Sequence, residues 1–159
     1  MTTPRRTQAS DQQPICELDF PSQPGNELAA VRAVLQNIQS YKISATKRER
    51  MKTAIAEATM NAMEHGNRFR VEDPVKIQIL AGRGQIIIKV MDLGDINTIP
   101  EAEIPDIDAK LAGKQSPRGW GLFLIRHMTD EMYVYAEGNF HITELVWNCE
   151  NETSEHLNG

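Results

Sequence analysis

The sequence has no long apolar run and no concentration of basic residues, and each absence excludes a class of protein. The longest unbroken apolar stretch is only a handful of residues, too short for a helix that spans a bilayer. The beginning of the chain contains two arginines but no apolar segment after them, so it does not read as a secretory signal. The net charge is −5, and lysine and arginine form no stripe, which argues against nucleic acid as the main partner.

The chain also has little cysteine. Its two cysteines, Cys16 and Cys149, lie far apart and lack the spacing of a metal site. Two free thiols in a reducing compartment are favoured over a disulfide. A length of 159 residues suits one domain with one core. These features predict a soluble, cytoplasmic, single-domain protein, but they do not indicate its function.

The composition divides the chain into a leader, a domain and a tail. Residues 1–14 are polar and have nothing to bury, which predicts a disordered leader, and residues 150–159 form a polar tail. The domain lies between them, over residues 15–149. Within it, residues 94–118 contain three prolines, two glycines and many acids without a sustained period. Such a long loop in a compact domain is typical of a lid or a binding segment.

Hydrophobic periodicity predicts the order of helices and strands. The predicted elements are a strand over residues 15–20, a helix over about 27–40 with Asn26 as its N-cap, a helix from 44–47 to about 67, a hairpin over 75–91, a helix over 121–130 and a hairpin over 132–147. This order predicts an α/β (α+β) sandwich with a mostly antiparallel sheet.

Three polar residues of the second predicted helix carry the first functional signal. Glu57, Asn61 and His65 are spaced by four, which places them along one stripe beside the apolar face of the helix. An amide oxygen can bind Mg²⁺, which usually takes one or two protein ligands besides substrate phosphates. The same spacing also fits a surface carboxylate, a mid-helix amide and a helix end at His65-Gly66. The pattern alone therefore leaves a metal–phosphate site open.

Two further segments add to this signal. The segment VMDLG, residues 90–94, places an acid at the end of a buried strand, close to a glycine that permits near backbone approach. The segment RGWG, residues 118–121, leads into a helix, whose free N–H groups and positive dipole end suit a phosphate. Each segment is common by itself, since Asp-x-Gly is a frequent turn and no GxGxxG motif is present.

Taken in this order, the three segments resemble the nucleotide-binding boxes of the GHKL superfamily, the histidine-kinase-like ATPases. EATMNAMEHGNRF resembles the N box, VMDLGD the adenine-contacting box, and RGWGLFLIRHMTDEM the glycine-rich box before the last helix. The likeness covers roughly residues 15–149. More narrowly, the chain resembles the bacterial anti-sigma factor serine/threonine kinases. This likeness implies a GHKL/Bergerat-type ATP-binding fold, with a mixed, mostly antiparallel sheet and helices on one face.

The resemblance also implies site residues. Asn61 matches the Mg²⁺ ligand, and Glu57, one turn earlier, matches the general base that orients the attacking hydroxyl. Asp92 matches the acceptor of the adenine amino group, and Gly94 lets the ring pack close. The residues implied to bind the nucleotide are Asn61, His65, Gly66, Asp92, Gly94, Gly119, Gly121 and Leu122.

The phosphate end is assigned by the same resemblance. Gly119 and Gly121 match the loop that wraps the phosphates, and residues 95–118 match the ATP lid. Arg118 is the candidate for the catalytic lid arginine near the γ-phosphate, and Lys114 is a second candidate.

The resemblance implies an ATP-dependent serine/threonine protein kinase with ATP/ADP and Mg²⁺ as its cofactors. Such a protein acts as an anti-sigma factor: it binds a sigma factor in one state and phosphorylates a STAS-type anti-anti-sigma antagonist in the other. A homodimer is expected, with no direct contact to nucleic acid or membrane. The alternative is a nucleotide-binding partner-switch module without kinase activity. Two departures from the family pattern motivate this alternative. Ile96 stands where the family often has a second glycine, and the place of the lid arginine could be taken by Arg118 or by Lys114.

Overall fold

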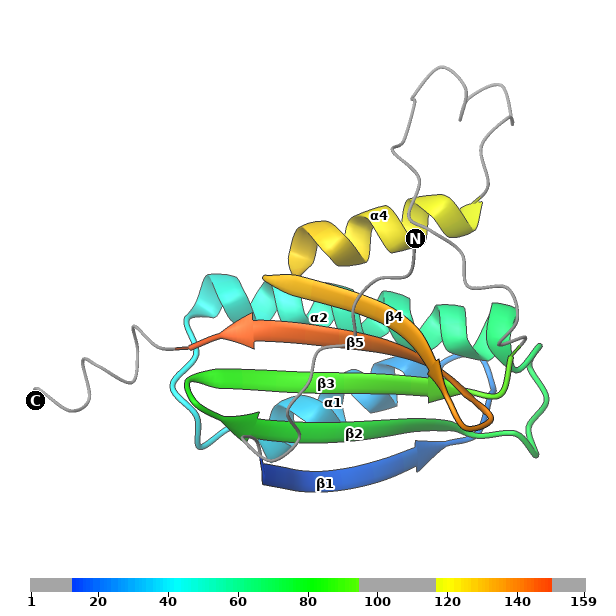
Figure 1. Ribbon diagram of the computed structural model, residues 1–159, viewed down its shortest axis with the longest axis horizontal. Helices are drawn as coiled ribbons and strands as arrows, with labels where there is room; N and C mark the ends of the chain where they lie inside the picture. Colours follow the sequence, from blue (N-terminus) through cyan, green and yellow to red (C-terminus); the bar gives the residue numbers. More distant parts are fainter. Residues whose placement is uncertain (1–12, 95–116, 150–159) are drawn as a thin grey trace, which may run out of the picture.

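The computed structural model describes residues 13–94 and 117–149 of the chain (Figure 1). The elements in chain order are β1 (Gln13–Phe20), α1 (Asn26–Asn37), α2 (Ala45–Asn61), η1 (Ala62–Gly66), β2 (Val75–Gly82), β3 (Gln85–Asp92), α4 (Pro117–Met128), β4 (Glu131–Glu137) and β5 (Phe140–Asn148). Most of the predicted leader, most of the predicted lid and the predicted tail lie outside the described residues. The last two residues assigned to the leader belong to β1 instead, and the last two assigned to the lid belong to α4.

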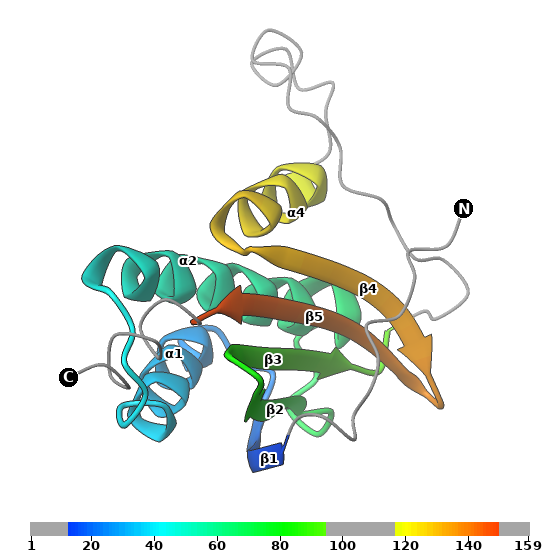
Figure 2. The ribbon, with the colours of Figure 1, turned by 60° about the vertical axis from the view of Figure 1, so that its left-hand side comes forward.

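The five strands form one sheet with helices on one face. The strand order is β1-β2-β3-β5-β4, and all four pairings among the described strands are antiparallel. The three α-helices lie on the same side of this sheet (Figure 2), and α2 packs against both α1 and α4. The predicted α+β sandwich is therefore confirmed.

The main core lies between the sheet and the helices. It is built from alternate residues of the strands and from the apolar stripes of the helices, because strand side chains alternate between two faces. The large buried residues of this core include Ile77, Ile79, Ile86, Ile88, Val90, Leu145, Trp147, Val34, Met51, Ile55, Met63 and Ile125. Asp92 follows Val90 by two residues, so the same alternation places its side chain on the helix side at the end of β3.

The helix expected from about residue 44 to 67 forms as two joined segments. Ser44 is the N-cap of α2, and its hydroxyl accepts a hydrogen bond from the N–H of Lys47 at 3.1 Å. After Asn61 the chain continues as the π-helix η1, and the N–H of Asn67 donates to the carbonyl of Ala62 at 2.8 Å. Single π-turns occur frequently at functional sites, and this one brings the end of the helix beside β3.

Two predicted helix starts are wrong. Gly25, not Asn26, precedes α1 with a φ of 102°, a left-handed conformation that glycine adopts without cost. The Asn26 side chain instead donates to the carbonyl of Pro21 at 2.7 Å. The last helix begins at Pro117 rather than Gly121, since proline suits a first helical position and tertiary packing overrides the low propensity of two glycines.

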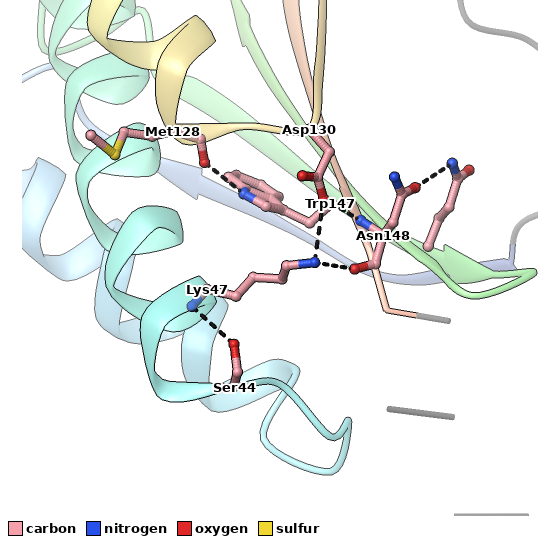
Figure 3. A network of polar contacts seen from close by, with 7 residues as sticks. Ser44, Lys47, Met128, Asp130, Trp147 and Asn148 are labelled. Carbon is pink, nitrogen blue, oxygen red and sulfur yellow. Dashed lines mark hydrogen bonds and ion pairs between the residues drawn. The ribbon is translucent and has the colours of Figure 1, made fainter. Parts of the chain in front are cut away.

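A polar network fastens the end of the molecule where α2 begins (Figure 3). Trp147 Nε1 donates to the carbonyl of Met128 at 2.9 Å, which holds the end of α4 against β5. Asp130 Oδ2 accepts from the N–H of Asn148 at 2.7 Å and pairs with Lys47 Nζ at 3.4 Å. Lys47 Nζ also donates to the carbonyl of Asn148. These contacts fix α2 and α4 relative to each other.

The two cysteines, Cys16 and Cys149, pack in the main core. Cys149 is buried, Cys16 is half-buried, and burial raises the pKa of the Cys16 thiol. The structure contains no disulfide between Cys16 and Cys149. None of the helices in the described part of the chain has the length and apolar character needed to cross a membrane.

Candidate functional site

Asp92 stands at the centre of the polar groups that gather where β3 ends beside η1. It is only 3% exposed. Its Oδ1 accepts a hydrogen bond from the N–H of Gly94 at 2.8 Å, and its Oδ2 lies 3.2 Å from Nδ1 of His141. A carboxylate has about four acceptor positions, so these two contacts leave acceptor capacity for a ligand.

Two glycines pack directly against this carboxylate. A Cβ atom added to Gly66 would lie 2.3 Å from Cγ and Oδ1 of Asp92. A Cβ atom added to Gly94 would lie 2.7 Å from the same Oδ1 and 2.9 Å from the Cα of Gly66. Contacts below 3.0 Å are not tolerated by ordinary side chains, so only glycine fits at both positions. The structure thus brings together three residues that the sequence predicts to bind the nucleotide.

Asn61 lies at the last turn of α2, facing α4. A Cβ atom added to Gly121 would lie 3.0 Å from Asn61 Nδ2 and 3.3 Å from Oδ1. The Nδ2 atom is buried and has no hydrogen-bond partner among the described residues. Leaving a buried amide group unpaired costs free energy, and such exceptions in a native fold call for an explanation such as a ligand.

Glu57 is half-buried and lies one helical turn before Asn61 on α2. Within residues 13–94 and 117–149, no group of three His, Cys, Asp or Glu side chains is arranged to hold a metal ion. A divalent cation near Asn61 would therefore depend on the side-chain oxygen of Asn61 and on oxygen atoms of a ligand.

The other predicted site residues are more dispersed. The His65 side chain is 32% exposed, and its Nε2 lies 3.9 Å from Glu64 Oε2. Leu122 is buried in the main core. Arg118 and Gly119 belong to the first turn of α4, but the Arg118 side chain lies outside what the structure describes, as does the whole of Lys114.

Sequence reasoning missed Asn67, which is 2% exposed. Its Nδ2 donates to the Ser22 hydroxyl at 3.1 Å and to the carbonyl of Asp73 at 2.9 Å, and its Oδ1 accepts from the N–H of Leu93 at 2.8 Å. This one amide joins the segment before α1, the segment before β2 and the residue that follows Asp92. Its position directly after His65-Gly66 was the only signal in the sequence.

We expect Asn67→Ala to lower the free energy of unfolding by about 2–4 kcal/mol, because it leaves several buried groups without partners. Urea denaturation measures this loss. Asn37→Ala is the matched control, since the Asn37 amide donates only to Ala33 within its own exposed helix turn. Equal effects of the two substitutions would contradict the structural importance of Asn67.

We expect Gly66→Ala to destabilise the protein by about 1–3 kcal/mol, because the new methyl group overlaps Asp92. The same substitution at Gly121 serves as the comparison. There the nearest neighbour is an amide nitrogen at 3.0 Å, and the gain in helix propensity of up to about 1 kcal/mol offsets the contact. Thermal unfolding of both variants tests this ranking, and a Gly66→Ala variant as stable as wild type would disprove the close packing.

Comparisons with known proteins agree with this fold. The family model of the histidine kinase-like ATPase domain matches residues 20–147. No curated protein sequence gives a significant match. The structure of the RsbU and RsbW domains of Rv1364c from Mycobacterium tuberculosis aligns with a TM-score of 0.60 and 13% identity, covering 86% of this chain and 32% of that one. This chain therefore spans about a third of that relative.

A second structure is covered almost completely. A chain in the SiaB–SiaC complex from Pseudomonas aeruginosa aligns with a TM-score of 0.61 and 15% identity, covering 86% of this chain and 91% of that one. At such identities the two structures show a shared fold.

Proposed function

The chain belongs to the histidine kinase-like ATPase family, and from this premise we propose that it binds Mg-ATP and transfers the γ-phosphate to a serine or threonine of a partner protein. We propose further that it is an anti-sigma factor, with a STAS-type antagonist as the phosphorylated partner. The observation that carries the proposal is the buried Asp92 carboxylate at the end of β3, which is ordered by Gly94 and His141 and packs against Gly66.

The nucleobase end of the site rests on hydrogen-bond chemistry. Asp92 is buried and ordered by two contacts, and it retains lone pairs that can accept the adenine amino group. Gly66 and Gly94 pack directly against this carboxylate, so a side chain at either position would overlap Asp92 and displace the acceptor. A buried acceptor that requires a donor discriminates strongly against a base that presents a carbonyl oxygen in its place.

The phosphate end rests on Asn61 and on the start of α4. The Oδ1 atom of Asn61 would hold Mg²⁺ together with phosphate oxygens, and the unpartnered Nδ2 atom would donate a hydrogen bond to a phosphate oxygen. When bound, Mg²⁺ neutralises charge on the transferred phosphoryl group. The N-terminal turn of α4 presents backbone N–H groups to an anion, and Gly121 keeps this helix close to Asn61. Glu57 would orient the attacking hydroxyl group and accept its proton.

A phosphoryl-transfer assay tests the proposal. The protein is incubated with Mg²⁺, γ-labelled ATP and candidate STAS-type proteins, and label on a serine or threonine of one of them is the expected result. The control is the same partner with that residue replaced by alanine. If a partner binds the ATP-bound protein but never acquires label, the proposed kinase activity is excluded.

A partner-switch module without kinase activity is the second candidate. The described contacts are most complete at the nucleobase end, and a protein that only senses nucleotide needs nothing more than these. The SiaB–SiaC structure is a complex of two proteins, which supports a protein partner under either proposal. ATP binding that changes partner affinity without transfer of label would favour the switch.

A further inference from the structure

His141 is the residue of β5 that lies directly opposite Asp92 in the antiparallel β3–β5 pair. Leu145 and Trp147 share its face of the strand and belong to the main core, so His141 also lies on the helix side. It is 5% exposed. No sequence motif drew attention to it.

The contact between the two side chains has a defined direction. A carboxylate oxygen can only accept a hydrogen bond, so Nδ1 of His141 carries the hydrogen and donates to Oδ2 of Asp92. Since Oδ1 accepts from the N–H of Gly94, each carboxylate oxygen has one fixed donor. Two donors on the two oxygens fix the plane of the carboxylate.

The second ring nitrogen of His141 indicates that this side chain does more than stabilise the fold. Nε2 of His141 is buried and has no hydrogen-bond partner among the described residues. A buried ring nitrogen without a partner costs free energy, which an apolar side chain of similar size would avoid. The contribution that only this side chain makes is therefore its single bond to Asp92.

We infer that His141 is a positioning residue for nucleobase recognition, which orients the Asp92 carboxylate so that its free lone pairs meet the 6-amino group of adenine. The inference rests on the proposed nucleotide site. His141 touches no ligand itself and acts through Asp92. Its loss should weaken binding only of those nucleotides that carry the amino group.

Two amide variants test the inference, because they differ only in reach. In His141→Asn, the amide nitrogen stands as far from Cβ as Nδ1 does, so it can still donate to Asp92. In His141→Gln, the amide reaches the position of Nε2 instead. Calorimetry measures the affinity of each for Mg-ATP and for the triphosphate of purine riboside, which has hydrogen in place of the 6-amino group.

We expect His141→Gln to bind ATP about 10-fold more weakly than wild type, whereas His141→Asn stays near wild type. Neither variant should change the affinity for purine riboside triphosphate. Equal losses in both variants, or equal losses for both nucleotides, would show a merely structural effect and overturn the inference. Unchanged ATP binding in His141→Gln would also overturn it. Failure of the wild type to bind ATP would instead reject the proposed function and the inference with it.

Discussion

An Asp92→Asn variant is expected to bind Mg-ATP about 100-fold more weakly than the wild type, because a charged acceptor is replaced by an amide. The amide nitrogen can face the adenine amino group, which places one donor against another. It can also face the N–H of Gly94 or the imidazole of His141, and then one of the contacts that order residue 92 is lost. Either orientation leaves a buried group unpaired.

Isothermal titration of Mg-ATP into both proteins measures this loss. Asp19→Asn is the matched control, since Asp19 lies on edge strand β1 opposite Lys76, away from the site. Thermal unfolding without nucleotide separates lost binding from lost stability. If Asp92→Asn binds ATP as tightly as the wild type, the assignment of the nucleobase end is wrong.

A Glu57→Gln variant is expected to transfer phosphate about 10²–10⁴-fold more slowly than the wild type, the range typical for loss of a general base. Its affinity for ATP should stay close to that of the wild type, because the glutamine keeps the size of the side chain and Asp92 and Asn61 are untouched. Phosphoryl transfer depends mainly on alignment and charge, so a group that orients the hydroxyl affects the rate rather than nucleotide binding.

Single-turnover transfer from labelled ATP to the partner measures the rate, and calorimetry measures the affinity. Glu49→Gln is the control on the same helix, two turns earlier, where the carboxylate is 69% exposed and pairs with Lys52. Equal transfer rates for Glu57→Gln and wild type would mean that Glu57 is not the base. A variant that loses ATP affinity as well would place Glu57 in nucleotide binding instead.

The elements with local hydrophobic patterns could be predicted from the sequence. The apolar stripe of α2 is buried at Met51, Ala54, Ile55 and Ala58, and the hairpin formed by β2 and β3 follows its alternation. Helix ends were less predictable. The start of α1 depends on the left-handed backbone of Gly25, and the start of α4 on packing against α2, neither of which appears in the local pattern.

The candidate site was predictable only where its residues fall in contiguous segments. Asp92, Gly66 and Gly94 were found in two motifs, and the structure places them in contact. The contact of Asp92 with His141 depends on the register of two strands that are 49 residues apart at this point. Asn67 was missed for a similar reason, since its partners Ser22 and Leu93 lie in distant segments.

The pairing of β3 with β5 decides when, during folding, the Asp92 carboxylate gains its contact with His141. The β2–β3 and β4–β5 hairpins close over short turns, and contacts of this kind form within microseconds. Joining the two hairpins through β3 and β5 closes a much longer loop and is slower. A nascent chain that has left the ribosome only as far as α4 already contains Glu57, Asn61 and Asp92, but not the strand that carries His141. The contact of His141 with the Asp92 carboxylate can therefore form only after β5 has been synthesised.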